Sequence, residues 1–253
     1  MSFLDENEIS RKLMETLGIQ KKPIAVKFLR PGESVPQNFK VPQRRMRFCQ
    51  AVMEATWGKA LAIQPTEMAC GPGPGSFGAP VKENVFKGNV HHALGLFEKP
   101  EAAVRCLSAN TKMMPGSIAH VLVAPLELGL MDPDVVILRV SPEQAMWLCQ
   151  TWTYPEGHHL KIDLQTEACV CSGIAVSTYL KNEIQIGLGC YGSRSATDMD
   201  PGEILVGIPG SLLERTVEVL TKMSKPISDS RSKRIFMEAY PEKRPLCPAP
   251  ETK

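Results

Sequence analysis

The 253-residue sequence contains no uninterrupted apolar run that approaches the roughly 18 residues needed to cross a membrane. Its first stretch, MSFLDENEISRKLMETLG, is acidic and amphipathic, and it lacks the basic segment followed by an apolar one that marks a secretory signal. These two absences predict a cytoplasmic protein with no membrane partner.

An excess of one sign of charge is absent as well, since the formal net charge is only +2. Two short basic clusters, at residues 44–47 and 231–234, are not interleaved with aromatic residues, which make up only 6% of the chain. Nucleic-acid-binding proteins typically carry a basic patch, often with aromatic side chains on which bases stack. We therefore expect no nucleic-acid partner and interpret both clusters as solvated surface.

The eight cysteines include no CxxC pair. This absence argues against a zinc ribbon or a thioredoxin motif, and the compact ferredoxin run is missing too. In a reducing compartment, cysteines serve more naturally as metal ligands or reactive thiols than as disulfides. A secreted, disulfide-bonded protein is the minor alternative.

Four of the cysteines lie at the predicted ends of helices or strands, or beside glycines. They are Cys49, Cys70, Cys171 and Cys190. Glycine lets the backbone approach inorganic sulfides and donate N–H hydrogen bonds to them, so this set predicts the ligands of an iron–sulfur cluster of the [4Fe–4S] type. The alternative is a set of buried, inert cysteines, since free cysteine is among the most buried residue types.

The remaining cysteines carry less weight. Cys169 lies two residues from Cys171, so either side chain is a candidate ligand and the choice between them stays open. We interpret Cys106, Cys149 and Cys247 as structural or incidental, with Cys247 in a proline-rich tail.

Cys70 opens the glycine-rich part of EMACGPGPGSFGAP, at residues 67–80. A phosphate cradle is disfavoured there, because the two prolines between the glycines have no N–H to donate and the Lys-Ser/Thr ending of a P-loop is absent. The stretch is better explained as the shaped wall of a pocket, with Gly71 and Gly73 contacting a bound cofactor. Gly192 and Arg194 are expected to contribute to the same contact, and a solvated turn is the alternative for Arg194.

Apolar runs typical of buried strands alternate with segments of helical periodicity along the chain. Strands are predicted over residues 22–29, 118–125, 134–140, 183–188 and 203–209, and helices over 10–17, 48–61, 89–97, 100–109, 142–151, 168–180 and 212–223. This order predicts an α/β or mixed α+β fold, a single compact domain with a mixed sheet flanked by helices. We place the domain at residues 1–225 and interpret residues 226–253 as a polar, proline-rich C-terminal extension, with one short helix around 232–239.

Five short sequence motifs follow one another in a specific order along the chain. They are Pro23-Ile24-Ala25-Val26-Lys27-Phe28, Phe48-Cys49-Gln50-Ala51-Val52, Cys70-Gly71, Pro133-Asp134-Val135-Val136 and Gly189-Cys190-Tyr191-Gly192-Ser193-Arg194. In this order they resemble the DUF169 family, and the resemblance covers the chain from about residue 10 to residue 222. The resemblance implies no reaction. It does imply an origin among anaerobic bacteria and archaea, and an anaerobic setting is compatible with oxygen-sensitive metal chemistry.

Together these features lead to one main hypothesis and two alternatives. The main one is an iron–sulfur protein in redox or electron-transfer chemistry, whose partner is a redox protein or a small-molecule substrate. The first alternative is a non-enzymatic protein that binds a cofactor or tetrapyrrole, and the second is a thiol enzyme with Cys49 as nucleophile. Whether the chain is an enzyme, and whether it forms a homo-oligomer, is left open.

Overall fold

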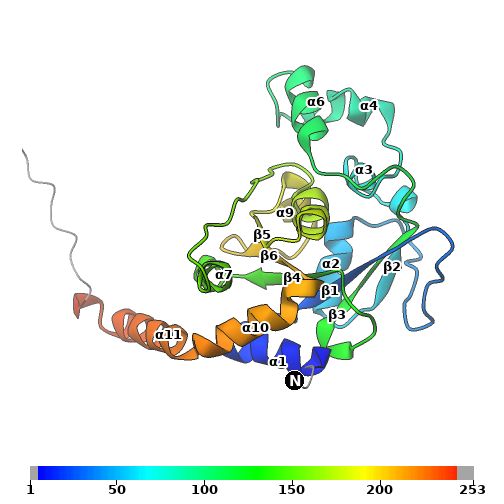
Figure 1. Cartoon of the computed structure of the whole chain (residues 1–253). Helices are drawn as coiled ribbons and strands as arrows, with labels where there is room; N and C mark the ends of the chain where they lie inside the picture. The colour runs from blue at the N-terminus through cyan, green and yellow to red at the C-terminus, as the bar shows by residue number, and fades with distance from the viewer. Residues whose placement is uncertain (1–4, 244–253) are drawn as a thin grey trace, which may run out of the picture.

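The computed structural model describes residues 5–243, and within them the fold is built on one six-stranded sheet (Figure 1). The strand order is β2-β3-β1-β4-β6-β5. The strands are β1 (Ile24–Leu29), β2 (Leu61–Ile63), β3 (His120–Pro125), β4 (Val135–Val140), β5 (Gln185–Gly187) and β6 (Ile204–Pro209). The fold is mixed α+β, and the sheet, expected to contain both strand directions, has only antiparallel pairings among these strands.

The two faces of the sheet are covered by different helices. Along β4, Val135 and Ile137 belong to one apolar cluster while Val136 and Leu138 belong to the other, because successive side chains of a strand point to opposite faces. The second cluster contains buried residues of α1 (Glu6–Leu17), α7 (Pro142–Thr153) and α10 (Leu213–Lys222). Both faces are therefore buried, which explains why the strands are largely apolar rather than alternating regularly with polar residues.

The first cluster contains the helices that matter for the chemistry. α2 (Phe48–Thr56) packs there beside a stretch of π-helix at Cys169–Val176, which continues into α8 (Ser177–Lys181). The sequence predicts a helix to residue 61, but α2 ends at Thr56 because Gly58 has a φ of 100° and the chain then enters β2. A π-helix is rare, and it is frequently found at functional sites.

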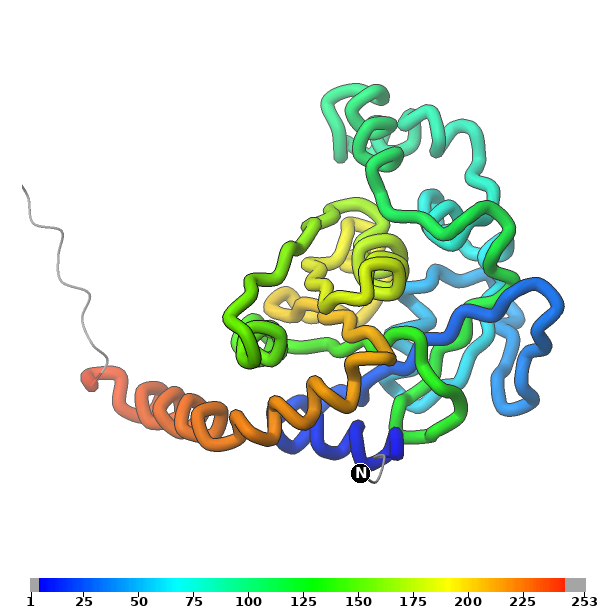
Figure 2. The backbone as a smooth tube through the Cα atoms, viewed as in Figure 1, coloured from blue at the N-terminus to red at the C-terminus, as the bar shows by residue number. Residues whose placement is uncertain are grey.

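A small group of helices stands apart from the sheet. We call residues 83–109 the helical lobe; it consists of α4 (Glu83–Phe86), α5 (Asn89–Ala93) and α6 (Pro100–Ala109). Figures 1 and 2 show this lobe above the short α3 (Gly73–Ser76) and near α9 (Tyr191–Ala196). The lobe therefore lies over the segment that carries Cys70.

The described part of the C-terminal extension is helical. α11 (Ser224–Ala239) projects from the body beyond α10, and it begins eight residues before the short helix that the sequence predicts. Cys247 lies outside the described residues. Single-turn 3₁₀ helices complete the structure at Pro65–Glu67, Leu126–Leu128, Gly210–Leu212 and Pro241–Lys243. Among residues 5–243, no helix combines the length and apolar character required to cross a membrane.

Candidate metal centre

Four cysteines from four separate elements line one small cavity of about 130 Å³. Cys49 lies in the first turn of α2, Cys70 precedes α3, Cys171 belongs to the π-helix, and Cys190 is the N-cap of α9. These are the four residues that the sequence predicts as cluster ligands. The fold thus brings together side chains that are up to 141 positions apart in the sequence.

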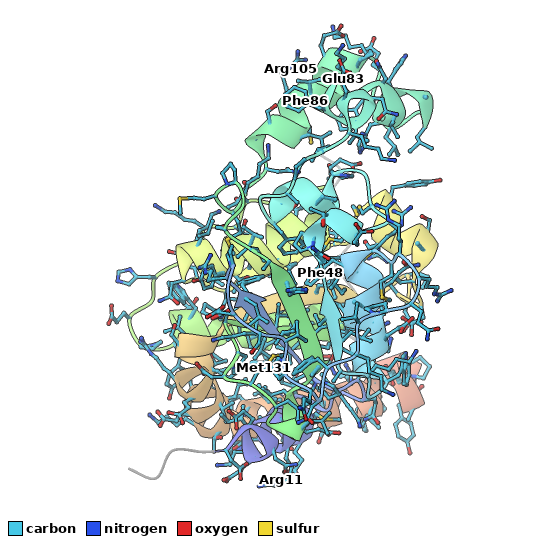
Figure 3. All side chains as sticks on the ribbon, turned by 90° about the vertical axis from the view of Figure 1, so that its right-hand side faces the viewer. Arg11, Phe48, Glu83, Phe86, Arg105 and Met131 are labelled. Carbon is cyan, nitrogen blue, oxygen red and sulfur yellow. The ribbon has the colours of Figure 1, made fainter. Side chains whose placement is uncertain are left out.

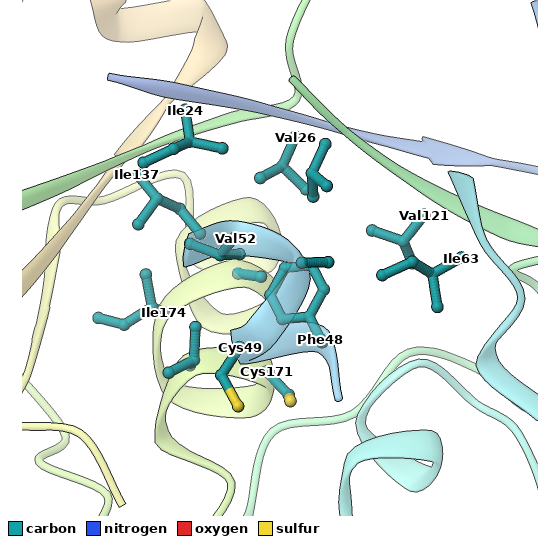
Figure 4. Packing of buried hydrophobic residues seen from close by; sticks show 14 of the residues in the cluster. Ile24, Val26, Phe48, Cys49, Val52, Ile63, Val121, Ile137, Cys171 and Ile174 are labelled. Carbon is teal, nitrogen blue, oxygen red and sulfur yellow. The ribbon is translucent and has the colours of Figure 1, made fainter. Parts of the chain in front are cut away.

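The sulfur atoms face a shared space. A methyl group placed on Gly73 would lie 3.2 Å from the Cys70 Sγ and 3.5 Å from the Cys171 Sγ, so both sulfur atoms border the same point. Figure 4 shows the sulfur atoms of Cys49 and Cys171 on the same side of the apolar cluster, away from β1. Gly73 is therefore a position where a larger residue would displace a candidate ligand.

The spacing of the side chains bears on the kind of metal site. Within residues 5–243, no three His, Cys, Asp or Glu side chains are arranged so that they could hold one metal ion. A zinc ion requires all its ligands within about 2.0–2.3 Å of one point. A four-iron cluster distributes its four cysteine ligands over separate irons, so its ligands do not need to converge on one point.

The structure distinguishes Cys171 from Cys169. Cys171 lines the cavity, whereas Cys169 does not. The Cys169 sulfur atom instead lies against β5, where a methyl group placed on Gly187 would be 2.5 Å from it. Cys106 in α6 and Cys149 in α7 also lie outside the cavity lining. The candidate ligand of this pair is therefore Cys171.

Burial acts on the acidity of three of the cavity thiols, Cys49, Cys70 and Cys171. Burial raises the pKa of Cys49 to about 12 and raises the pKa of Cys70 and Cys171 as well, and neighbouring thiols add to the shift. The Arg47 guanidinium and the Gln50 amide act in the opposite direction on Cys49, but burial outweighs them. Because metals bind the thiolate, loading this site must release protons.

The raised pKa leads to a prediction for thiol labelling. In the metal-free protein at pH 7, iodoacetamide is expected to modify Cys49 no faster than the half-buried Cys106, because the thiolate is the reactive form and Cys49 remains a thiol. The rate at Cys49 should increase as the pH rises towards about 12. Mass spectrometry of the labelled peptides measures both rates, and selective labelling of Cys49 at pH 7 would favour a nucleophilic cysteine instead.

Arg47 brings a positive charge to the cavity. The N-cap residue of α2, Arg47, lines the cavity, and a methyl group placed on Gly192 would lie 2.5 Å from its Nη1. No acidic partner of its guanidinium is found within residues 5–243. The sequence-based interpretation of residues 44–47 as solvated surface is thus wrong for Arg47, which lowers the pKa of Cys49 and Cys70 against the larger effect of burial.

A buried His–Glu pair also lines the cavity. The His91 Nε2 lies 3.6 Å from the Glu167 Oε2, and the buried His91 Nδ1 has no hydrogen-bond partner among the described residues. Burial lowers the pKa of His91 and raises the pKa of Glu167. No pattern in the sequence points to this pair, because the two residues are 76 positions apart and come together only through the helical lobe.

The predicted cofactor contacts separate into two groups. Gly71 and Gly192 line the cavity, and Gly73 is buried behind Cys70. Arg194 is not part of the lining. Its guanidinium donates hydrogen bonds to the backbone carbonyls of Leu188, Asp200, Pro201 and Glu203, so its donors are already used to hold the segment after Cys190.

Comparison with known proteins gives the family. The family model DUF169, described as "Uncharacterised ArCR, COG2043", matches residues 12–219. The chain belongs to the DUF169 family. It is 28% identical over 224 residues to "Uncharacterized protein MJ0308" of Methanocaldococcus jannaschii, which covers 86% of this chain and 95% of the relative. No solved structure matches the chain.

The DUF169 match contains the whole candidate centre. All four cavity cysteines, together with Arg47, His91 and Glu167, lie between residues 12 and 219. α11 begins after the matched region. The cavity is thus part of the DUF169 domain rather than of the C-terminal extension.

Proposed function

We propose that this DUF169 protein binds an iron–sulfur cluster of the [4Fe–4S] type through Cys49, Cys70, Cys171 and Cys190. The observation that supports the proposal is that four thiols from four separate elements line one cavity, with no carboxylate needed to complete the set. Such a cluster supplies one-electron transfer. We therefore propose a role in redox or electron-transfer chemistry, with a redox protein or a small molecule as partner.

The residues around the thiols suit an anionic cluster. Backbone amides of Gln50 and Gly73 donate hydrogen bonds to the sulfur atoms of Cys49 and Cys70, respectively. Hydrogen bonds to the sulfurs and nearby charge are two of the features that tune the potential of a cluster. Arg47 provides the nearby positive charge, and the apolar cluster on which Cys49 and Cys171 pack keeps water away from them.

Both alternative functions have less support. An activated nucleophile requires a lowered thiol pKa, whereas burial raises the pKa of Cys49 to about 12. Organic cofactors usually occupy pockets of about 300–1,000 Å³, so the cysteine-lined cavity of about 130 Å³ is too small to hold one beside the four thiols. Arg194, which the tetrapyrrole hypothesis invokes, has its guanidinium bound to backbone carbonyls.

The direct test is anaerobic reconstitution of the full-length protein with iron and sulfide. The expected product is brown, absorbs at about 400 nm and contains about four irons and four sulfides per chain. Mononuclear binding would give about one iron and no sulfide. A protein that stays colourless and free of iron would refute the proposal.

A further inference from the structure

A second and much larger cavity lies on the other side of the glycine-rich turn. Its volume is about 660 Å³, within the usual range of small-molecule sites. It is bounded by the helical lobe, the residues that follow Cys70, and the segment 112–118. None of the four candidate ligand cysteines lines it. It is therefore a separate space and not an extension of the metal centre.

The glycines of the turn separate the two cavities. A methyl group placed on Gly73 would meet the sulfur atoms of Cys70 and Cys171, whereas one placed on Gly75 would lie 2.7 Å from the Val81 Cγ2. A methyl group on Gly71 would contact Val85 at 3.3 Å. Because both valines line the larger cavity, the turn is a thin wall between the two spaces, closely packed at Gly71 and too tight for a side chain at Gly75 unless Val81 moves.

The lining of the larger cavity is mainly apolar. It includes Val81, Val85, Phe86, Leu107 and Met113. Phe86 is 64% exposed although it lines the cavity, and Figure 3 shows it on the helical lobe, away from the core residue Phe48. An exposed aromatic side chain in a concave apolar site gains contact area when a ligand covers it.

The polar side of the cavity carries one positive charge. Lys112 belongs to the lining, and it makes no ion pair or side-chain hydrogen bond with any residue that the structure describes. No Asp or Glu lines the cavity. A charged group without a partner beside an apolar surface favours a ligand of opposite charge.

We propose that this cavity binds a small organic anion, with an apolar body against the helical lobe and its acidic group at Lys112. Pro72 lines both cavities, so the bound molecule lies directly behind the wall that carries Cys70. Asn110 also lines the larger cavity and donates a hydrogen bond to the carbonyl of Glu167 in the wall of the smaller one. The proposal does not depend on the cluster, because no candidate metal ligand contributes to the cavity.

Two fluorescent probes test the shape and the charge separately in the full-length protein without added metal. 1-Anilinonaphthalene-8-sulfonate has an apolar body and an anionic group, and N-phenyl-1-naphthylamine has the same body without the charge. We expect both to bind saturably with one site per chain. Lys112→Gln should weaken binding of the anionic probe by about three-fold, the scale of an exposed ion pair. It should leave the affinity for the neutral probe unchanged.

A steric variant tests the location. Ser108 is an exposed residue of α6 that lines the cavity, so Ser108→Trp should fill space there and weaken both probes by at least about ten-fold. Lys99→Gln and Ser232→Trp are matched controls at exposed positions outside the cavity, and both should bind like the parent protein. Circular dichroism checks that each variant is folded.

Four results would overturn the inference: no saturable binding, unchanged binding in a folded Ser108→Trp variant, equal effects of Lys112→Gln on both probes, or a dimer of the chain whose formation excludes the probes. If the protein binds the probes but never takes up iron and sulfide, the cluster proposal is refuted and the proposed anion site is still supported. The two proposals are therefore distinguishable.

Discussion

Replacing any one of Cys49, Cys70, Cys171 or Cys190 by serine is expected to lower the iron content after anaerobic reconstitution from about four to below about one per chain. Thiolate ligands select iron–sulfur clusters, and a serine hydroxyl is a harder ligand that remains protonated at neutral pH. Each variant loses a candidate ligand from a different segment of the chain. An equal loss of iron in all four variants would show that these segments form one site.

Two other cysteines provide matched controls. Cys169 belongs to the same π-helix as Cys171 but lies against Gly187, and Cys149 lies in α7 on the opposite face of the sheet. Cys169→Ser and Cys149→Ser should therefore retain about four irons. Iron and sulfide analysis, with absorption spectra, measures the outcome. Loss of the cluster in the Cys169 variant, with retention in the Cys171 variant, would show that the ligand is Cys169 and that our choice of Cys171 is wrong.

Arg139→Met is expected to reduce the free energy of unfolding by about 3–5 kcal/mol, because it removes one partner of a buried ion pair. The Arg139 side chain is fully buried at the end of β4, and its Nε and Nη2 each lie 2.9 Å from a Glu203 carboxylate oxygen. Its Nη1 also lies 3.0 Å from Asp198. Lys21, 3.1 Å from Glu203, is the cation that would remain, so we expect the lower part of this range.

Two comparison variants show whether the effect comes from the buried charge. The double variant Arg139→Met, Glu203→Leu removes both partners, and it should be more stable than Arg139→Met alone. Arg11→Met removes an exposed pair with Glu15 at the surface position labelled in Figure 3, and it should cost less than about 1 kcal/mol. Urea unfolding followed by circular dichroism measures all three. Equal costs for Arg139→Met and Arg11→Met would contradict the buried-pair explanation.

The Arg139 network also supports the candidate metal centre. Glu203 accepts a hydrogen bond from the Asp200 amide, and Arg194 donates to the carbonyls of Leu188 and Glu203 on either side of Cys190. These contacts hold the segment from β5 to β6 that presents Cys190 to the cavity. On the proposed function, a folded Arg139→Met variant is therefore expected to take up less iron on anaerobic reconstitution than the parent protein.

Much of the fold was predictable from local patterns. The buried strands are recognisable in the sequence as apolar runs. The N-cap residue Ser141, which pairs with Gln144, marks the start of α7. The predictions that differ from the structure concern features that depend on distant partners. α2 ends early because the chain turns at Gly58 into β2, which pairs with β3, and the strand directions follow from which strands become neighbours.

By itself, the sequence determined the fold class, the family resemblance and the four cysteines that stand at element ends or beside glycines. Only the tertiary structure selected Cys171 over Cys169, brought Arg47 and the His91–Glu167 pair to the same cavity, and placed a second cavity behind the glycine turn. The physical reason is that chemistry-bearing side chains are recognisable by type and local spacing. Their convergence depends on the strand order and on how α2, the π-helix and the helical lobe pack, and neither is encoded in any short stretch of the chain.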